Sequence, residues 1–306
     1  MRLWGGLLMC AVLSGQEVYK FESNVSLVRV DVEVLSESKA VRRLGVNDFR
    51  VLDNGAEQRI VDVSEAGQGL DIVLLFDVSG SMKLAVERAA AGIQRALASL
   101  QPGDRVAVMT FASRTKLLLP FTEDKEQVRA MVEQRVPRVG FGGWTYIYDA
   151  ISDASRYHAQ DGRGGRRRAI VIVTDNVGQK HRVSERSALT SLWESDAVLA
   201  GVVVRNPKEE QQAMMVVRID RIAEESGGQA VTADDPGGTL ATLFERLRGR
   251  YTLYYSMPQG TPGEKRTVRV ELQGEGAELY PNAQVYARKG YYLPGGDANP
   301  GKRVKR

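Results

Sequence analysis

The feature that most constrains the fold is an unbroken apolar run, Ile72–Phe76. A strand with one buried face alternates apolar and polar residues, so an unbroken run is typical of a central strand that is covered on both faces. The run ends at Asp77, and Ser79 and Ser81 follow at alternate positions. We therefore expect a buried strand of an open α/β sheet, and ligands of such sheets bind at the carboxyl ends of the strands.

Segments of strand length and helix length alternate around this run, from residue 69 to residue 249. Such alternation indicates a doubly wound, mostly parallel sheet, so the fold class expected here is α/β. The expected strands are 71–77, 105–111, 116–120, 169–174, 197–204 and 229–232, and the expected helices are 83–100, 123–135, a helix ending near 158, 184–194, 217–226 and 239–248.

Short strands with turn signals stand on either side of this α/β segment. Val25–Val34 alternates like a half-buried strand, and Asp53-Asn54-Gly55 is a hairpin turn signal. Neither end has enough strands to be stable alone. We therefore predict that 17–68 and 250–292 pair into one small β-sandwich-like domain, into which the α/β segment 69–249 is inserted. The strands expected in the second part are 251–255, 267–272, 277–279, 285–288 and 289–292.

The first residues, 1–16, combine one positive charge with a short apolar stretch that ends in small residues. This pattern resembles a secretory signal peptide, and the stretch is shorter than the about 20 residues that a membrane-spanning helix needs. Cys10 is the one cysteine, but Met9 is not the small residue expected before a lipoprotein cysteine. We therefore expect a secreted or periplasmic protein, cleaved near Ser14–Gln16, in preference to lipid anchoring at Cys10.

Composition excludes some classes of partner. With 43% hydrophobic and 26% charged residues, the chain is typical of a soluble globular protein. The net charge of +4 does not support binding to nucleic acid. The basic run 163–168 precedes an expected strand, and we interpret it as a solvated loop. Residues 293–306 are rich in Pro, Gly, Lys and Arg, which is typical of a disordered basic tail.

Two later segments carry further oxygen ligands. Thr145 lies in Gly142-Gly143-Trp144-Thr145, and Asp175 follows the apolar strand 169–174. Carboxylate and hydroxyl oxygens suit hard divalent cations such as Mg2+, Mn2+ or Ca2+. The alternative for the first loop is helix capping, because Ser is a good N-cap residue. Taken together, one set of residues resembles the metal-ion-dependent adhesion site of von Willebrand factor A domains: Asp77, Ser79, Ser81, Thr145 and Asp175.

The resemblance implies a role for each residue. Ser79, Ser81 and Thr145 would contact the metal directly, while the two aspartates would act through water. Mg2+ is the first expected cation, and an acidic residue of a protein partner would complete its coordination. Asp149 corresponds to a residue that stabilises the loop or helix.

The sequence departs from the family pattern at two positions. Trp144 intervenes before Thr145, and Asn176 stands where many members have Gly. Trp144 is either a contact anchor for a partner or a residue packed on the neighbouring loop. With Asp48-Phe49 and the segment 288–292 included, nearly the whole mature chain resembles the bacterial "VWFA-related domain" family, which implies no particular activity.

Catalytic signatures are absent from the sequence. His158 and His181 are the two histidines, Ser79 lacks a Gly-x-Ser-x-Gly elbow, and no Walker A sequence occurs. The glycines of 140–143 lack the context of a dinucleotide loop. We therefore expect no enzyme and no cofactor besides the cation. The expected function is partner binding through the cation; a structural scaffold with a stapling metal and a weak metal-dependent hydrolase are the alternatives.

Overall fold

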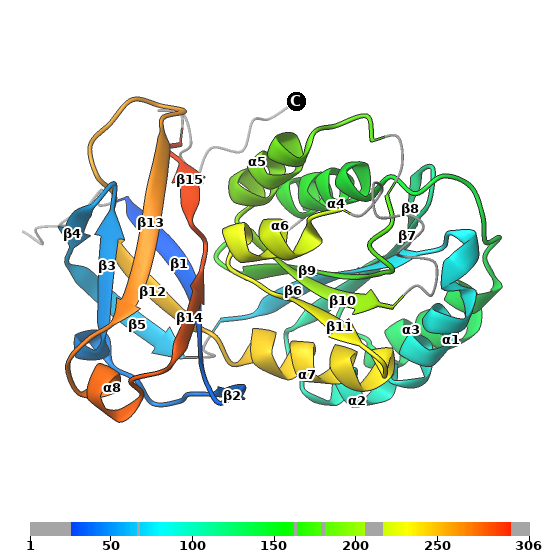
Figure 1. Ribbon diagram of the computed structural model, residues 1–306, viewed down its shortest axis with the longest axis horizontal. Coiled ribbons are helices and arrows are strands. Elements are labelled where there is room, and N and C mark those ends of the chain that lie inside the picture. The colour runs from blue at the N-terminus through cyan, green and yellow to red at the C-terminus, as the bar shows by residue number, and fades with distance from the viewer. Residues whose placement is uncertain (1–25, 66–67, 162–163, 179–180, 206–216, 295–306) are drawn as a thin grey trace, which may run out of the picture.

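The computed structural model describes residues 26–65, 68–161, 164–178, 181–205 and 217–294. The signal peptide expected at 1–16 and the part of the expected tail from 295 onward lie outside these residues. Figure 1 shows an α/β layered unit beside a unit made of antiparallel sheets. Among the described residues, no helix is both long and apolar enough to cross a membrane.

The α/β unit is built on a six-stranded sheet with the order β11-β10-β9-β6-β7-β8. All neighbouring strands are parallel except the edge pair, where β8 runs antiparallel to β7. The prediction of a doubly wound, mostly parallel sheet is therefore confirmed. The strands are β6 (Leu70–Asp77), β7 (Arg105–Phe111), β8 (Thr115–Thr122), β9 (Arg167–Thr174), β10 (Ala197–Val204) and β11 (Ala230–Ala233).

The apolar run lies in β6, at the centre of the sheet, and its side chains serve two cores. Ile72, Leu74 and Phe76 point to one core, and Val73 and Leu75 to the other. Helices cover both faces, as Figure 1 shows, so the run needs no polar residue. One face carries α1 (Lys83–Ala91), α2 (Ile93–Ala98), α3 (Lys125–Ala130) and α7 (Pro236–Arg248); the other carries α4 (Ile147–Asp161), α5 (Glu185–Ser195) and α6 (Ile219–Ser226).

Two expected helices differ from the structure. The helix expected at 83–100 is divided at Gly92, where a Cβ would lie 2.3 Å from the Cα of Gly237. The backbone of α7 therefore fills the space that a side chain at position 92 would need. The helix expected at 123–135 is α-helical only over α3, continues as a π-helical segment, η3 (Met131–Arg135), and ends in a 3-10 turn, η4 (Val136–Arg138).

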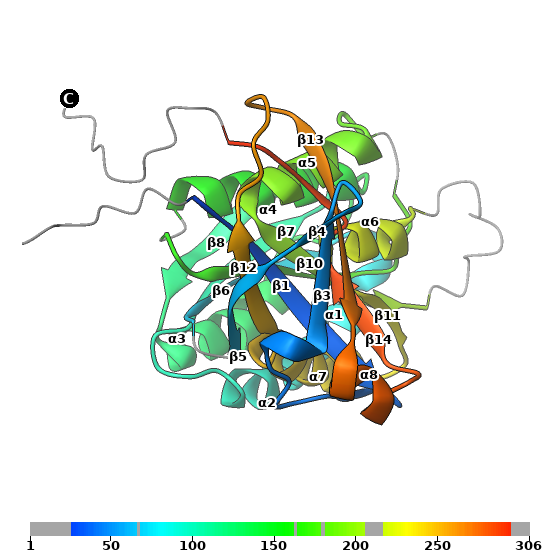
Figure 2. The ribbon, with the colours of Figure 1, turned by 90° about the vertical axis from the view of Figure 1, so that its left-hand side faces the viewer.

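The second unit combines strands from before and after the α/β segment, as predicted. In one sheet β1 pairs antiparallel with β12 and with β14, and in the other β13 pairs antiparallel with β3. Figure 2 looks onto this unit and shows strands from the two ends side by side. The strands are β1 (Leu27–Ser36), β2 (Lys39–Ala40), β3 (Phe49–Asp53), β4 (Ala56–Gln58), β5 (Ile60–Glu65), β12 (Tyr251–Ser256), β13 (Lys265–Leu272), β14 (Gln284–Ala287) and β15 (Gly290–Tyr292).

Three expectations for this unit are wrong. The first strand is not half-buried: Asp31 and Glu33 on its polar side are 9% and 6% exposed, because Glu33 pairs with Arg246 of α7. Residues 277–279 form the end of a helix, α8 (Gly274–Leu279), because Asp48 accepts a hydrogen bond from the Gly276 backbone. The disordered tail was expected to begin at residue 293, but Leu293 is buried in the core between the sheets.

The basic run at 163–168 is not a solvated loop over its described residues. Arg167 is 2% exposed, and its guanidinium donates to the carbonyls of Leu247, Arg248 and Arg250. Arg167 thereby ties the start of β9 to the end of α7, next to the chain's return into β12. The sequence prediction failed here because a run of arginines does not reveal which carbonyls surround it.

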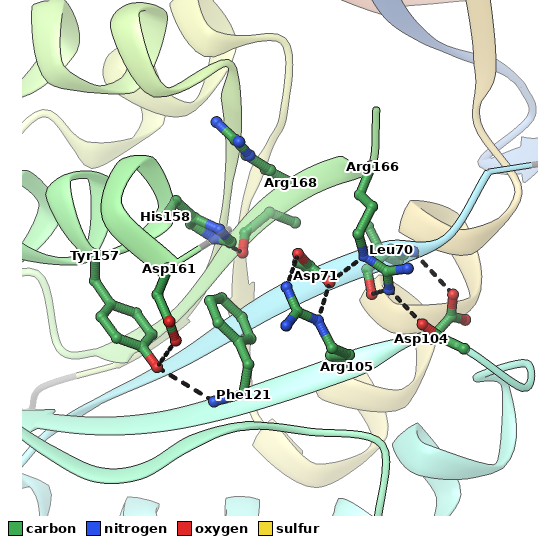
Figure 3. A network of polar contacts seen from close by, with 12 residues as sticks. Leu70, Asp71, Asp104, Arg105, Phe121, Tyr157, His158, Asp161, Arg166 and Arg168 are labelled. Atoms are coloured by element: carbon green, nitrogen blue, oxygen red, sulfur yellow. Dashed lines mark hydrogen bonds and ion pairs between the residues drawn. The ribbon is translucent and has the colours of Figure 1, made fainter. Parts of the chain in front are cut away.

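Figure 3 shows the polar network at the amino ends of the central strands. Asp71 is fully buried and accepts hydrogen bonds from Arg105 and Arg166. Burial alone would raise the pKa of Asp71, but the hydrogen bonds and charges of the two arginines outweigh it and hold the pKa below its ordinary value. This end of the sheet is thus filled by paired charges, and the opposite, carboxyl end carries the candidate site.

Candidate metal site

Asp77 is the last residue of β6, and its carboxylate is held from two sides. Its side chain is fully buried. The backbone N–H of Ser79 donates to Oδ1 at 2.8 Å, and the Thr174 hydroxyl donates to Oδ2 at 2.7 Å. Because Thr174 ends β9, the strand beside β6, the parallel pairing of the two strands fixes the carboxylate.

Ser79, Ser81 and Asp175 form a second set of contacts beside Asp77. The Ser81 hydroxyl donates to Asp175 Oδ2 at 2.7 Å, and its oxygen lies 3.4 Å from Ser79 Oγ. The other oxygen of Asp175 accepts from the Val177 backbone N–H at 3.2 Å. The structure therefore brings four of the five residues expected at the site into one connected group.

Thr145 lies on a third loop that is attached to the first two. The backbone N–H of Gly142 donates to the Val78 carbonyl at 3.0 Å, and that of Tyr146 donates to the Ala112 carbonyl at 3.1 Å. Thr145 is 6% exposed. Within the described ranges, the Thr145 hydroxyl makes no hydrogen bond to the other four residues. The structure therefore attaches the loop of Thr145 to the group through backbone hydrogen bonds, without a direct side-chain bond.

Helix capping does not account for the two serines. Ser79 occupies the N-cap position of a 3-10 turn, η2 (Gly80–Met82), but its side chain makes no capping hydrogen bond. The helix α1 begins only after Met82, which also provides no side-chain cap. The hydroxyls are therefore not engaged in capping.

The group holds two buried carboxylates, those of Asp77 and Asp175. Burial, and then the negative charge of Asp175, raise the pKa of Asp77 to about 7, although hydrogen bonds from Ser79 and Thr174 oppose the shift. In the part of the chain that the structure describes, no Lys or Arg forms an ion pair with Asp77. The donors are all oxygen, from two carboxylates and three hydroxyls, and such a set fits a hard divalent cation.

No three His, Cys, Asp or Glu residues cluster with the spacing of a metal site in the described part of the chain. The candidate set has two acidic residues and relies on hydroxyls for the rest. It therefore differs in kind from a cluster of acids and histidines.

The structure gives a physical reason for one departure from the family pattern, Asn176, and places the other, Trp144, at the surface. Asn176 has a φ of 63°, in the left-handed region that Gly favours and Asn tolerates. Trp144 is 47% exposed, and its backbone N–H donates to Ser113 Oγ at 3.0 Å. The indole is thus presented at the surface beside Thr145.

Asp149 and His181 hold neighbouring segments together. The Arg182 backbone N–H donates to Asp149 Oδ2 at 2.9 Å, which fits the stabilising role implied for Asp149. His181 is half-buried, with its ring 4.2 Å from that of Tyr148, and burial lowers its pKa. It is therefore a packed side chain and not a solvated one.

Sequence reasoning missed Thr174 as a partner of Asp77. Thr174 was visible only as the last residue of an apolar strand, and nothing in its sequence position indicates a contact with a residue 97 positions away. Its role follows from the register of β6 and β9, which a single sequence does not specify.

Residues 72–179 match the family model of the von Willebrand factor type A domain. Among solved structures, the chain is similar to the BatB protein from Bacteroides thetaiotaomicron, with 22% identity, a TM-score of 0.46 and coverage of 58% of this chain and 97% of that one. An aerotolerance-related membrane protein from Bacteroides fragilis gives 20% identity, a TM-score of 0.45 and coverage of 58% and 98%.

A longer match is the von Willebrand factor type A protein from Catenulispora acidiphila, with 14% identity, a TM-score of 0.47 and coverage of 93% of this chain and 78% of that one. Structural similarities with TM-scores this low carry no information on what this chain binds. The family model is the finding that concerns the candidate site, since its matched range contains all five residues.

Proposed function

We propose that this chain, whose residues 72–179 match the family model of the von Willebrand factor type A domain, is a binding protein that recognises an acidic side chain of a protein partner through a divalent cation. The residues proposed to hold the cation are Asp77, Ser79, Ser81, Thr145 and Asp175. The observation that carries the proposal is the hydrogen-bonded group in which Ser81 joins Asp175 beside the buried carboxylate of Asp77.

Each residue has a distinct part in this proposal. The hydroxyls of Ser79, Ser81 and Thr145 hold the ion, and the carboxylates of Asp77 and Asp175 balance its charge and order its waters. Few direct charges on the ion leave it attractive to one further carboxylate, which the partner supplies. Mg2+ is the first candidate, with Mn2+ and Ca2+ as alternatives.

The loops of the site argue against a purely stapling metal. Gly142 is bonded to Val78, Tyr146 to Ala112, and Ser81 to Asp175, all through protein atoms. These bonds already connect the loops after β6, β7 and β9. A metal is therefore not needed to hold the loops together, which favours a role in recognition.

We also infer that the chain is not an enzyme. A metal-dependent hydrolase needs a general base within hydrogen-bond reach of the reacting water. His158 is fully buried and bonded to the Ala169 carbonyl at 2.9 Å, and His181 packs on Tyr148. Neither histidine is arranged as a base at the site.

The proposed setting is secreted or periplasmic, because residues 1–16 have the pattern of a signal peptide. In this setting, the β segments 17–68 and 250–292 act as the support from which the α/β segment presents its site. The junctions to β5 and β12 lie at the amino ends of the strands, away from Asp77, so the proposed site is left open to a partner.

A pull-down from envelope extracts tests the proposal. The wild type and Asp77→Asn are used as baits, each in Mg2+ and in EDTA. We expect a partner that is retained only by wild type in Mg2+. The matched control is Asp124→Asn, which changes an exposed helix-capping carboxylate on α3. A partner captured equally in EDTA or by Asp77→Asn would contradict cation-dependent recognition.

A further inference from the structure

A groove lies beside the proposed metal site, between the β7–β8 hairpin and the segment 139–142. Its larger part has a volume of about 480 Å³ and is lined by Val78, Arg114, Lys116, Leu118, Val139 and Gly142 among others. A second hollow of about 360 Å³ shares Leu118 and Val139 and adds Arg135 and Arg138. Figure 1 places β7, β8 and α3 at the end of the molecule away from the antiparallel sheets. We call the two hollows together the basic groove.

The basic groove begins at the proposed metal site. Val78, which lines it, stands between Asp77 and Ser79 in the chain. Gly142, which also lines it, donates its N–H to the Val78 carbonyl. A ligand that fills the groove therefore has one end next to the loop that carries two of the proposed metal ligands.

The charge of the groove has one sign. Arg114, Lys116, Arg135 and Arg138 are all exposed, and no Asp or Glu among the described residues lines either hollow. Within the described ranges, none of these four side chains forms an ion pair or a hydrogen bond. Four basic side chains on one groove without acidic neighbours leave a positive potential there.

The adjacent acidic residues are already paired with another arginine. Arg129 of α3 binds Glu126 at 2.6 Å and Glu133 at 2.8 Å. Glu133 belongs to the same π-helical segment as Arg135, yet its carboxylate faces Arg129. The positive charge of the groove is therefore not neutralised by the protein itself.

We propose that the basic groove binds an acidic segment of a protein partner that runs on from the carboxylate recognised at the metal site. The inference deepens the proposed function and depends on it only for the metal end of the segment. Val78, Leu118 and Val139 give the groove an apolar floor, which suits aliphatic side chains between the acidic ones. This floor favours a peptide over a nucleic acid, whose backbone would bring only charge to it.

Fluorescence anisotropy with a labelled peptide of alternating Asp and Leu residues tests the groove, in Mg2+ and in EDTA. The test variant is R135E/R138E. The matched control is R59E/R186E, which reverses two exposed arginines elsewhere that form no ion pair with any described residue. Both variants change the net charge equally. We expect binding at least about tenfold weaker for R135E/R138E in either buffer, because the variant removes two charges that attract the peptide and adds two that repel it. Binding to the control should be unchanged. The same peptide with Asn in place of Asp should not bind.

The outcomes separate the groove from the metal site. Binding that falls in R135E/R138E, but not in EDTA or in Asp77→Asn, supports the groove and contradicts the proposed function. Binding that needs Mg2+ and Asp77 but is unchanged by R135E/R138E overturns the groove alone. Equal loss in the control variant also overturns it, since the effect would then be one of net charge.

Two further measurements complete the test. R114E/K116E reverses the other pair of basic residues, so a folding defect in one variant, detected by thermal unfolding, leaves the second to decide. A single-stranded oligonucleotide with the charge of the peptide is the competitor. If it binds as tightly and through the same residues, the assignment to an acidic peptide is wrong.

Discussion

Asp77 shows how a few contacts turn a strand end into a candidate ligand site. One carboxylate oxygen accepts from a backbone N–H and the other from the Thr174 hydroxyl. A buried carboxylate held in this way cannot turn toward another partner, so a cation would meet a fixed arrangement of oxygens. Part of this arrangement could be predicted from the sequence, because acids and hydroxyls at strand ends are visible there. The contact with Thr174 could not.

His158 gives a residue-scale prediction for pH. Burial lowers the pKa of His158 to about 4, while an exposed histidine titrates near 6.5. Between these values the unfolded chain binds a proton that the folded chain does not. The contribution of His158 to the free energy of unfolding therefore does not change with pH above about pH 6.5. It falls by up to about 3 kcal/mol as the pH falls toward 4.

Urea denaturation of wild type and His158→Leu at several pH values from 7.5 downward checks this prediction. The variant should lose less stability than wild type over the acidic range. His181→Gln is the comparison: burial lowers the pKa of His181 as well, but His181 is only half-buried, so this variant should change the pH dependence less than His158→Leu does. Identical pH dependence in wild type and His158→Leu would show that the buried imidazole does not contribute.

At the scale of elements, the apolar run predicted β6 and its central place, because an unbroken run has few other solutions in a soluble protein. The division of the helix between α1 and α2 could not be predicted in this way. Gly92 alone does not reveal that Gly237, far along the chain, occupies the space of its side chain. The helix α8 was missed for a similar reason, since Asp48 fixes its start from another part of the chain.

Gly92→Ala tests the close approach of α2 and α7. The added Cβ would lie 2.3 Å from the Gly237 Cα, so the helices must move apart. We expect the free energy of unfolding to fall by about 2 kcal/mol, as for other overpacked cores, even though Ala is the better helix former. Chemical denaturation measures the change. Gly164→Ala, where a Cβ meets nothing within 4 Å, is the control. A stabilised Gly92→Ala would contradict the packing argument.

At the scale of the whole molecule, the two ends of the chain build one unit and the middle builds another. The insertion could be predicted, because neither end has enough strands of its own. The surface between the units could not be predicted, because the sequence of the basic run 163–168 indicated a solvated loop. In the structure, Arg167, Arg248 and Arg250 are all buried there.

Arg167→Met tests the connection between the units. The side chain keeps its apolar stem, but the carbonyls of Leu247, Arg248 and Arg250 lose their donor. Because buried acceptors without a donor are costly, we expect a loss of about 3 kcal/mol and a broader thermal transition. Calorimetry measures both. Arg186→Met, an exposed arginine, should behave as wild type. An unchanged thermal transition in Arg167→Met would show that Arg167 does not connect the two units.

The most direct test of the central claim is a calorimetric titration of Mg2+ and Mn2+ into wild type and Ser81→Ala. Ser81 is exposed and bonded to Asp175, so its loss should alter the proposed site more than the fold. Ser99→Ala, which removes a hydroxyl bonded to the Ala96 carbonyl, is the control. We predict saturable binding to wild type and to Ser99→Ala, and affinity at least about tenfold lower for Ser81→Ala, a loss of about 1.4 kcal/mol. Equal affinity in all three proteins, or no binding to wild type, would contradict the account.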